Sequence, residues 1–78
     1  MTLQQIAPVV VNSTLLRSVS FDVGPSILEL EFRDGALYRY FDVPETIYTG
    51  LLAADSKGSY FNRWIRSCFR YALIRGPQ

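Results

Sequence analysis

Two alternating runs on either side of a turn decide the fold, and both lie within residues 28–40, which read LELEFRDGALYRY. Large apolar or aromatic side chains recur at every second position, the period of a strand with one buried face. Asp34-Gly35 stands between the runs and is typical of a tight turn. The segment therefore predicts an antiparallel hairpin.

Two turn geometries compete at this hairpin, and they place Arg39 on opposite faces. A two-residue turn at Asp34-Gly35 would put the guanidinium among buried leucines without an evident partner, which costs several kcal/mol. A three-residue loop, 33–35, with Gly35 left-handed, turns Arg39 outward. We therefore expect the bulged loop. Its register places Leu30 opposite Tyr38, Leu28 opposite Tyr40 and Glu29 opposite Arg39.

Working outward, a further alternating run, Val19, Phe21 and Val23, precedes the hairpin and ends at Gly24-Pro25-Ser26. With it the sequence predicts a three-stranded meander over about 15–23, 27–33 and 36–42. The edge near Arg17-Ser18-Val19 would then be open and able to pair with a second copy of the chain.

The apolar period changes after Pro44, which suits the first position of a helix, with Asp42 or Val43 as its cap. Ile47, Tyr48, Leu51 and Leu52 follow at helical spacing, and the helix is expected to end near Ala54. Gly50 weakens it unless another group packs closely there.

A second helix is predicted to begin with Asp55 or Ser56 as its cap. Its apolar stripe, which includes Cys68 as a small core residue, consists of Phe61, Trp64, Ile65, Cys68 and Phe69. Residues 71–74 can add a short C-terminal edge strand. The expected architecture is an α+β domain: a three-stranded antiparallel meander followed by two helices on one face, with residues 1–10 as an N-terminal extension and 11–78 as the single domain.

Composition excludes several classes of function. The 78 residues contain no histidine and one cysteine, Cys68, which removes His-based catalysis, Cys/His metal sites and a disulfide framework. No apolar run approaches the about 20 residues of a membrane span, and no signal peptide is evident. Glu29 and Glu31 form the one close pair of same-face carboxylates, and no pocket is implied beside them. We expect a cytoplasmic protein that is not an enzyme and that uses no cofactor and no metal.

Charge is unevenly divided along the chain. Residues 1–50 hold three basic and six acidic side chains, a net −3, whereas residues 51–78 hold five basic and one acidic, a net +4. At about 100° per residue, Arg63, Arg66 and Arg70 fall within an arc of about 60° on the second helix. Such a row is either a solvated helix back or a phosphate-binding ridge. Lys57, at the start of that helix, is a further candidate anion contact.

Tyr38 and Tyr40 lie two apart on one strand and so share a face. Aromatic side chains on a sheet beside arginines can stack unpaired RNA bases. The bulged loop instead turns both rings inward, where they pack in the core. Both interpretations keep the two tyrosines among the candidate nucleic-acid-binding residues.

These residues together resemble the KTSC domain. The resemblance covers residues 11–74, and the ordered series that carries it consists of Val11-Asn12-Ser13-Thr14, Leu28-x-Leu30-x-Phe32, Gly35, Tyr38-Arg39-Tyr40, Phe41-Asp42-Val43-Pro44, Ile47-Tyr48, Leu51-Leu52, Ala54-x-Ser56-x-Gly58-x-Tyr60-Phe61-Asn62 and Ile65-Arg66. That module occurs at the C-terminus of some lysyl-tRNA synthetases and as a stand-alone bacterial or phage protein. The resemblance implies a small stand-alone module and, through the synthetase connection, RNA binding; it implies no catalytic residue.

The function expected from the sequence is therefore a non-catalytic nucleic-acid-binding module that prefers RNA. Its candidate contacts are Lys57, Arg63, Arg66, Arg70, Tyr38 and Tyr40. The alternative is a protein-interaction or accessory module, or a homodimer, that uses the sheet edge or the helix backs. No membrane partner is expected.

Overall fold

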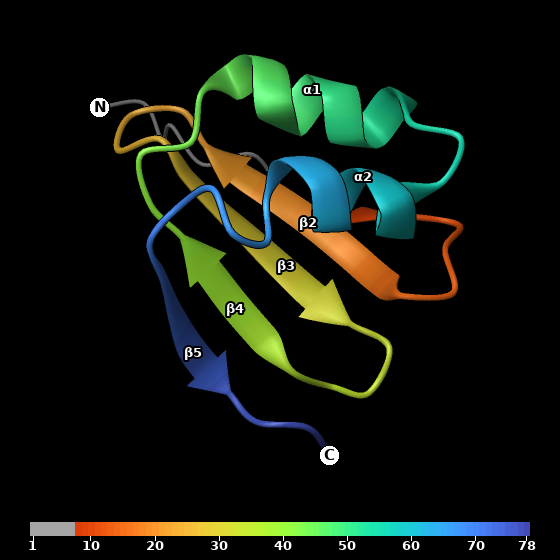
Figure 1. The fold of residues 1–78 in the computed structure, drawn as a ribbon. Coiled ribbons are helices and arrows are strands. Elements are labelled where there is room, and N and C mark those ends of the chain that lie inside the picture. The colour runs from red at the N-terminus through yellow and green to blue at the C-terminus, as the bar shows by residue number, and fades with distance from the viewer. Residues whose placement is uncertain (1–7) are drawn as a thin grey trace.

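A single antiparallel sheet dominates the computed structural model, which describes residues 8–78 (Figure 1). Its strands pair in chain order, so that each strand lies beside the next one along the chain. The strands are β1 (Val9–Val10), β2 (Leu16–Asp22), β3 (Ile27–Phe32), β4 (Leu37–Tyr40) and β5 (Tyr71–Arg75). Two helices, α1 (Glu45–Ala53) and α2 (Lys57–Trp64), lie between β4 and β5 in the chain.

The turn between β3 and β4 has the bulged geometry that the sequence predicts. Gly35 adopts a φ of 96°, and its N–H donates to the Phe32 carbonyl at 3.0 Å. The register is also confirmed: Leu28 pairs with Tyr40, Glu29 with Arg39 and Leu30 with Tyr38. Arg39 Nη2 lies 2.6 Å from Glu29 Oε2 on the face of the sheet away from the helices. The bulged turn thus keeps the Arg39 guanidinium out of the apolar core, where it would be buried without a partner.

The sheet is larger than the predicted meander because a strand is added at each edge. β5 pairs with β4 and confirms the C-terminal edge strand. β1 pairs with β2 through Val9–Val19 and Val10–Ser18, so the edge expected to be open near residues 17–19 is covered. Of the predicted N-terminal extension, residues 1–7 lie outside the described residues, while Val9–Val10 forms β1.

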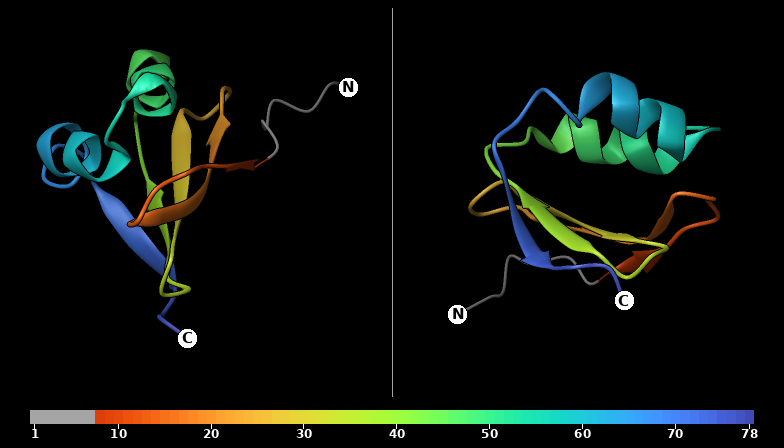
Figure 2. Two further views of the ribbon diagram at one scale, coloured as in Figure 1. Left: turned by 90° about the vertical axis from the view of Figure 1, so that its right-hand side faces the viewer. Right: turned by 60° about the horizontal axis from the view of Figure 1, so that its bottom comes forward.

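Both helices cover the same face of the sheet, as expected (Figure 2). Pro44 is the N-cap of α1, where Asp42 or Val43 was expected, and the helix ends at Ala53. Ser56 is confirmed as the cap of α2, since its Oγ accepts a hydrogen bond from the Ser59 N–H at 3.2 Å. Within residues 8–78 neither helix is long and apolar enough to cross a membrane.

The second helix is shorter than its apolar stripe predicts. It ends at Trp64, and the N–H groups of Ile65 and Arg66 both donate to the Phe61 carbonyl, at 3.0 and 2.9 Å, as the chain turns. Cys68 is exposed, so its prediction as a core residue is wrong. Pairing of β5 with β4 requires the chain to reverse here, and this long-range contact overrides the helical period.

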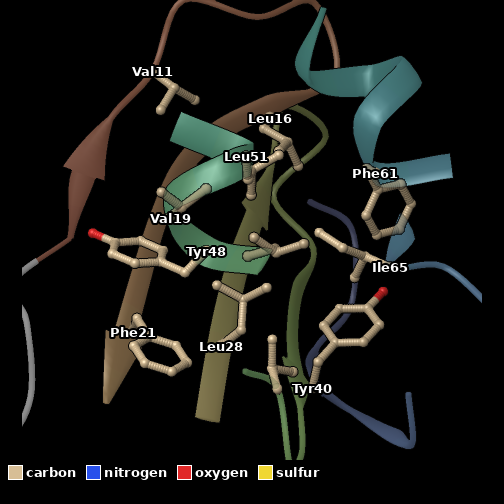
Figure 3. Close-up of a cluster of buried hydrophobic side chains, with 12 residues drawn as sticks. Val11, Leu16, Val19, Phe21, Leu28, Tyr40, Tyr48, Leu51, Phe61 and Ile65 are labelled. Atoms are coloured by element: carbon tan, nitrogen blue, oxygen red, sulfur yellow. The ribbon is translucent and has the colours of Figure 1, made fainter. Parts of the chain in front are cut away.

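The core lies between the helices and the inner face of the sheet (Figure 3). Leu16, Leu28, Leu30, Leu51 and Ile65 are completely buried. The rings of Phe21 and Tyr48 stack with centroids 5.2 Å apart, which joins β2 to α1. Phe61 and Ile65 pack in this core and hold the end of α2 over β4. The candidate site lies between these two elements.

Candidate functional site

The predicted arginine row does not form on one helix face. Arg63 is on α2, but Arg66 and Arg70 follow the helix end at Trp64. The Arg63 guanidinium lies over the Trp64 ring, 5.1 Å from its centroid. The ridge geometry was therefore wrong, because the helix ends before the second and third arginines.

Arg70 is paired with an acid. Its Nη2 lies 2.8 Å from Asp42 Oδ2, and its guanidinium carbon lies 5.4 Å from the centre of the Phe41 ring. Both charged side chains are more than three-quarters exposed, at 76% and 79%, so the pair adds at most about 1 kcal/mol to stability. Its main effect is to reduce the positive charge that Arg70 presents.

Lys57 is used for structure at the junction of the helices. Its Nζ donates to the Ala54 carbonyl at 2.8 Å and so satisfies an acceptor that the end of α1 leaves free. Ser56 is occupied as the α2 cap. The candidate anion site at the start of α2 thus has internal partners for both of its polar side chains.

The two tyrosines of β4 instead meet a third from β5. The ring centroid of Tyr71 lies 5.7 Å from that of Tyr38 and 5.7 Å from that of Tyr40. Antiparallel pairing of β4 with β5 places Tyr71 directly opposite Tyr40, so all three rings share the helix-side face of the sheet. Tyr40 is buried, Tyr38 is half-buried and Tyr71 is exposed.

These rings line a groove of about 880 Å³ between β4, β5 and the end of α2. The aromatic side chains that line it are Phe32, Tyr38, Tyr40, Phe61, Phe69 and Tyr71. Edge-to-face contacts hold its floor: the centroids of Phe32 and Phe61 are 5.4 Å apart, and those of Tyr40 and Phe61 are 6.0 Å apart. The groove thus offers ring faces and edges that neighbouring residues hold in place.

Polar groups border the groove where the chain leaves α2. Asn62, Arg66 and Ser67 line it, and all three are exposed. Among the described residues Arg66 forms no ion pair, in contrast to Arg70. Arg66 is therefore the predicted arginine that the structure brings together with Tyr38 and Tyr40.

The titration of Tyr40 depends on the groups that surround it. Burial, together with the neighbouring Tyr38 and Tyr71 hydroxyls, raises the pKa of Tyr40 to about 12. The positive charge of Arg66 acts in the opposite direction. The Tyr40 hydroxyl consequently stays protonated at neutral pH and can donate a hydrogen bond.

Sequence reasoning missed Tyr71 as a member of the site and assigned Phe61 and Phe69 only to the core. The available signal was the Tyr71-x-Leu73 alternation, which has the strand period of Tyr38 and Tyr40. Without the β4–β5 register, nothing placed Tyr71 beside the other two rings.

The family model of the KTSC domain matches residues 12–71. The chain belongs to the KTSC domain family. A solved KTSC domain protein from Yersinia pestis superposes with a TM-score of 0.85 at 30% identity, covering 88% of this chain and 97% of that one. A protein of Stutzerimonas stutzeri is 49% identical over 55 residues, which is 70% of this chain and 78% of the relative. A lysine–tRNA ligase of Nostoc is 36% identical over 63 residues, 81% of this chain but only 11% of the ligase.

Proposed function

We propose that this KTSC domain is a non-catalytic module that binds nucleic acid, with RNA as its preferred ligand, through the aromatic groove and Arg66. The observation that carries the proposal is that six aromatic side chains and an arginine without an acidic partner among the described residues line one groove. Aromatic faces stack bases of any sequence, and a guanidinium binds phosphate through a planar pair of donors. Together they match the two chemical parts of a nucleotide.

The comparison with the lysine–tRNA ligase supports RNA over DNA. That relative is named for a tRNA substrate, and it contains a segment similar to 81% of this chain. Since the segment is 11% of the ligase, the aminoacylation activity of the whole enzyme is not part of the proposal. The proposal uses only the fact that a similar segment belongs to an enzyme named for an RNA substrate.

The other candidate residues contribute unequally in this proposal. Arg66 lines the groove, whereas Arg63 lies beside it on α2 and Arg70 shares its charge with Asp42. Lys57 points to the Ala54 carbonyl and adds little beyond net charge. With so few free cations, affinity should be modest and should fall as salt increases.

Fluorescence anisotropy with a labelled mixed RNA pool at low salt tests the proposal. We expect Arg66→Gln to weaken binding about tenfold, the worth of one charge-assisted hydrogen bond. Arg17→Gln is the matched control, since it removes the same charge from a residue that lies 3.6 Å from Glu31 and does not line the groove. Undetectable binding, or equal losses in the two variants, would overturn the proposal.

The outer edge of β5 favours protein interaction as a second candidate function. Among residues 8–78 no strand pairs with that edge, and Tyr71, Leu73 and Ile74 are exposed by 58%, 53% and 45%. Such an edge can accept another strand, including that of a second copy. Light scattering over a concentration series tests self-association: a doubled mass that Leu73→Lys abolishes would support this function, and a constant monomer mass would exclude the homodimer.

A further inference from the structure

Tyr40 combines deep burial with a hydroxyl that has no hydrogen-bond partner among the described residues. The residue is 3% exposed, and its Oη forms no hydrogen bond with any of the described residues. The side chain of Tyr40 lines the groove. A buried hydroxyl normally has a partner, and one that faces a groove can take it from a ligand.

The direction of this hydroxyl narrows the choice of ligand. Figure 3 shows it on the side of the ring that faces Phe61 and Ile65, where α2 ends. Asn62 and Arg66, which line the groove, come from the same part of the chain. The groove thus combines a floor of rings with several hydrogen-bond donors at one side.

An unpaired nucleobase fits this combination better than a duplex or a simple anion. A base has a flat face for the rings and a polar edge with acceptors for the donors. In a duplex the faces of each base are stacked and its Watson–Crick edge is paired, so neither is available to the groove. A bare phosphate would leave the aromatic floor without a partner, and the volume of about 880 Å³ is that of a pocket for a small ligand.

We infer that the groove holds an unpaired base of a single strand and that the Tyr40 hydroxyl donates a hydrogen bond to the edge of that base. The inference rests on the proposed function and names the class of nucleic acid that it takes. Tyr71 supplies the exposed stacking face, and Arg66 contacts the adjoining phosphate.

The first experiment compares three labelled RNAs of equal length by anisotropy: a single strand, the duplex of the same sequence and an abasic single strand. We expect the single strand to bind at least tenfold more tightly than either of the others. Equal binding of single strand and duplex, or of single strand and abasic strand, would overturn the inference while leaving nucleic-acid binding in place. Absence of binding to all three would overturn the proposed function as well.

The second experiment uses Tyr40→Phe, which removes the hydroxyl and keeps the ring. We expect it to weaken single-strand binding about five- to tenfold, the range for one lost hydrogen bond, with no loss of thermal stability, because the hydroxyl bonds to none of the described residues. Tyr48→Phe is the matched control, since Tyr48 is 4% exposed, forms no side-chain hydrogen bond within residues 8–78 and does not line the groove. Equal affinities of the two variants would show that the Tyr40 hydroxyl does not contact the base.

Discussion

The side chain of Tyr60 on α2 occupies the space that a side chain on Gly50 of α1 would need. A Cβ built on Gly50 would overlap the Tyr60 hydroxyl oxygen and lie 2.9 Å from the ring carbon Cζ. This contact lets the two helices cross closely above the sheet, and it explains a glycine in the middle of α1. By contrast, a Cβ on Gly58 of α2 would meet Leu15 at 3.7 Å, an ordinary contact.

The two helical glycines should therefore respond oppositely to alanine. We expect Gly50→Ala to destabilise the fold by about 1–3 kcal/mol, because the overlap with Tyr60 outweighs the gain in helix propensity. Gly58→Ala should stabilise it by up to about 1 kcal/mol, since only the propensity changes. Urea denaturation measures both. In a Tyr60→Ala background Gly50→Ala should become neutral or stabilising; a cost that persists there would contradict the assigned contact.

Gly35 should tolerate alanine poorly because of its backbone. Its φ of 96° is strained for any residue with a Cβ, and that atom would lie 3.1 Å from the Gln78 nitrogen. We expect Gly35→Ala to cost about 1–2 kcal/mol in thermal denaturation. Gly76→Ala is the control, because a Cβ there meets nothing within 4 Å. Equal stability of the two variants would mean that the bulged turn relaxes without cost.

Features that residues close together in the sequence determine could be predicted. Features that depend on pairing between distant strands could not. The turn at Gly35 and the Leu30–Tyr38 register followed from period and charge alone. The end of α2 did not, because the apolar spacing continues past Trp64 and only pairing of β5 with β4 makes the chain reverse.

The candidate site divides in the same way. Tyr38, Tyr40 and Arg66 were named from local pattern, and the structure gathers them. Their common groove could not be predicted, because it requires Tyr71 to lie opposite Tyr40 across two strands that residues 41–70 separate in the sequence. The predicted arginine row did not form because the prediction assumed that α2 continues as far as its apolar period does. The helix ends at Trp64 instead.

Alkaline pH should destabilise the protein through Tyr40. Its pKa is about 12 in the folded chain and about 10 in the unfolded chain, so the folded state holds this proton to higher pH. Stability is then unaffected below about pH 10 and falls between about pH 10 and 12, by up to about 3 kcal/mol. Urea denaturation across this range measures the loss. Tyr40→Phe should reduce the slope without abolishing it, because burial also raises the pKa of Tyr48; an unchanged slope would exclude Tyr40 as the main cause.

Releasing Arg70 from Asp42 should strengthen nucleic-acid binding. Asp42→Asn removes the carboxylate that lies 2.8 Å from the guanidinium, and asparagine accepts the φ of 57° at this position. Because an exposed pair of this kind is worth about 0.5 kcal/mol, we expect RNA affinity to rise about two- to threefold and its salt dependence to steepen. Asp55→Asn changes the net charge equally, and an equal gain there would assign the effect to overall charge. If Arg70 is the released contact, adding Arg70→Gln to Asp42→Asn must return the affinity to the wild-type value.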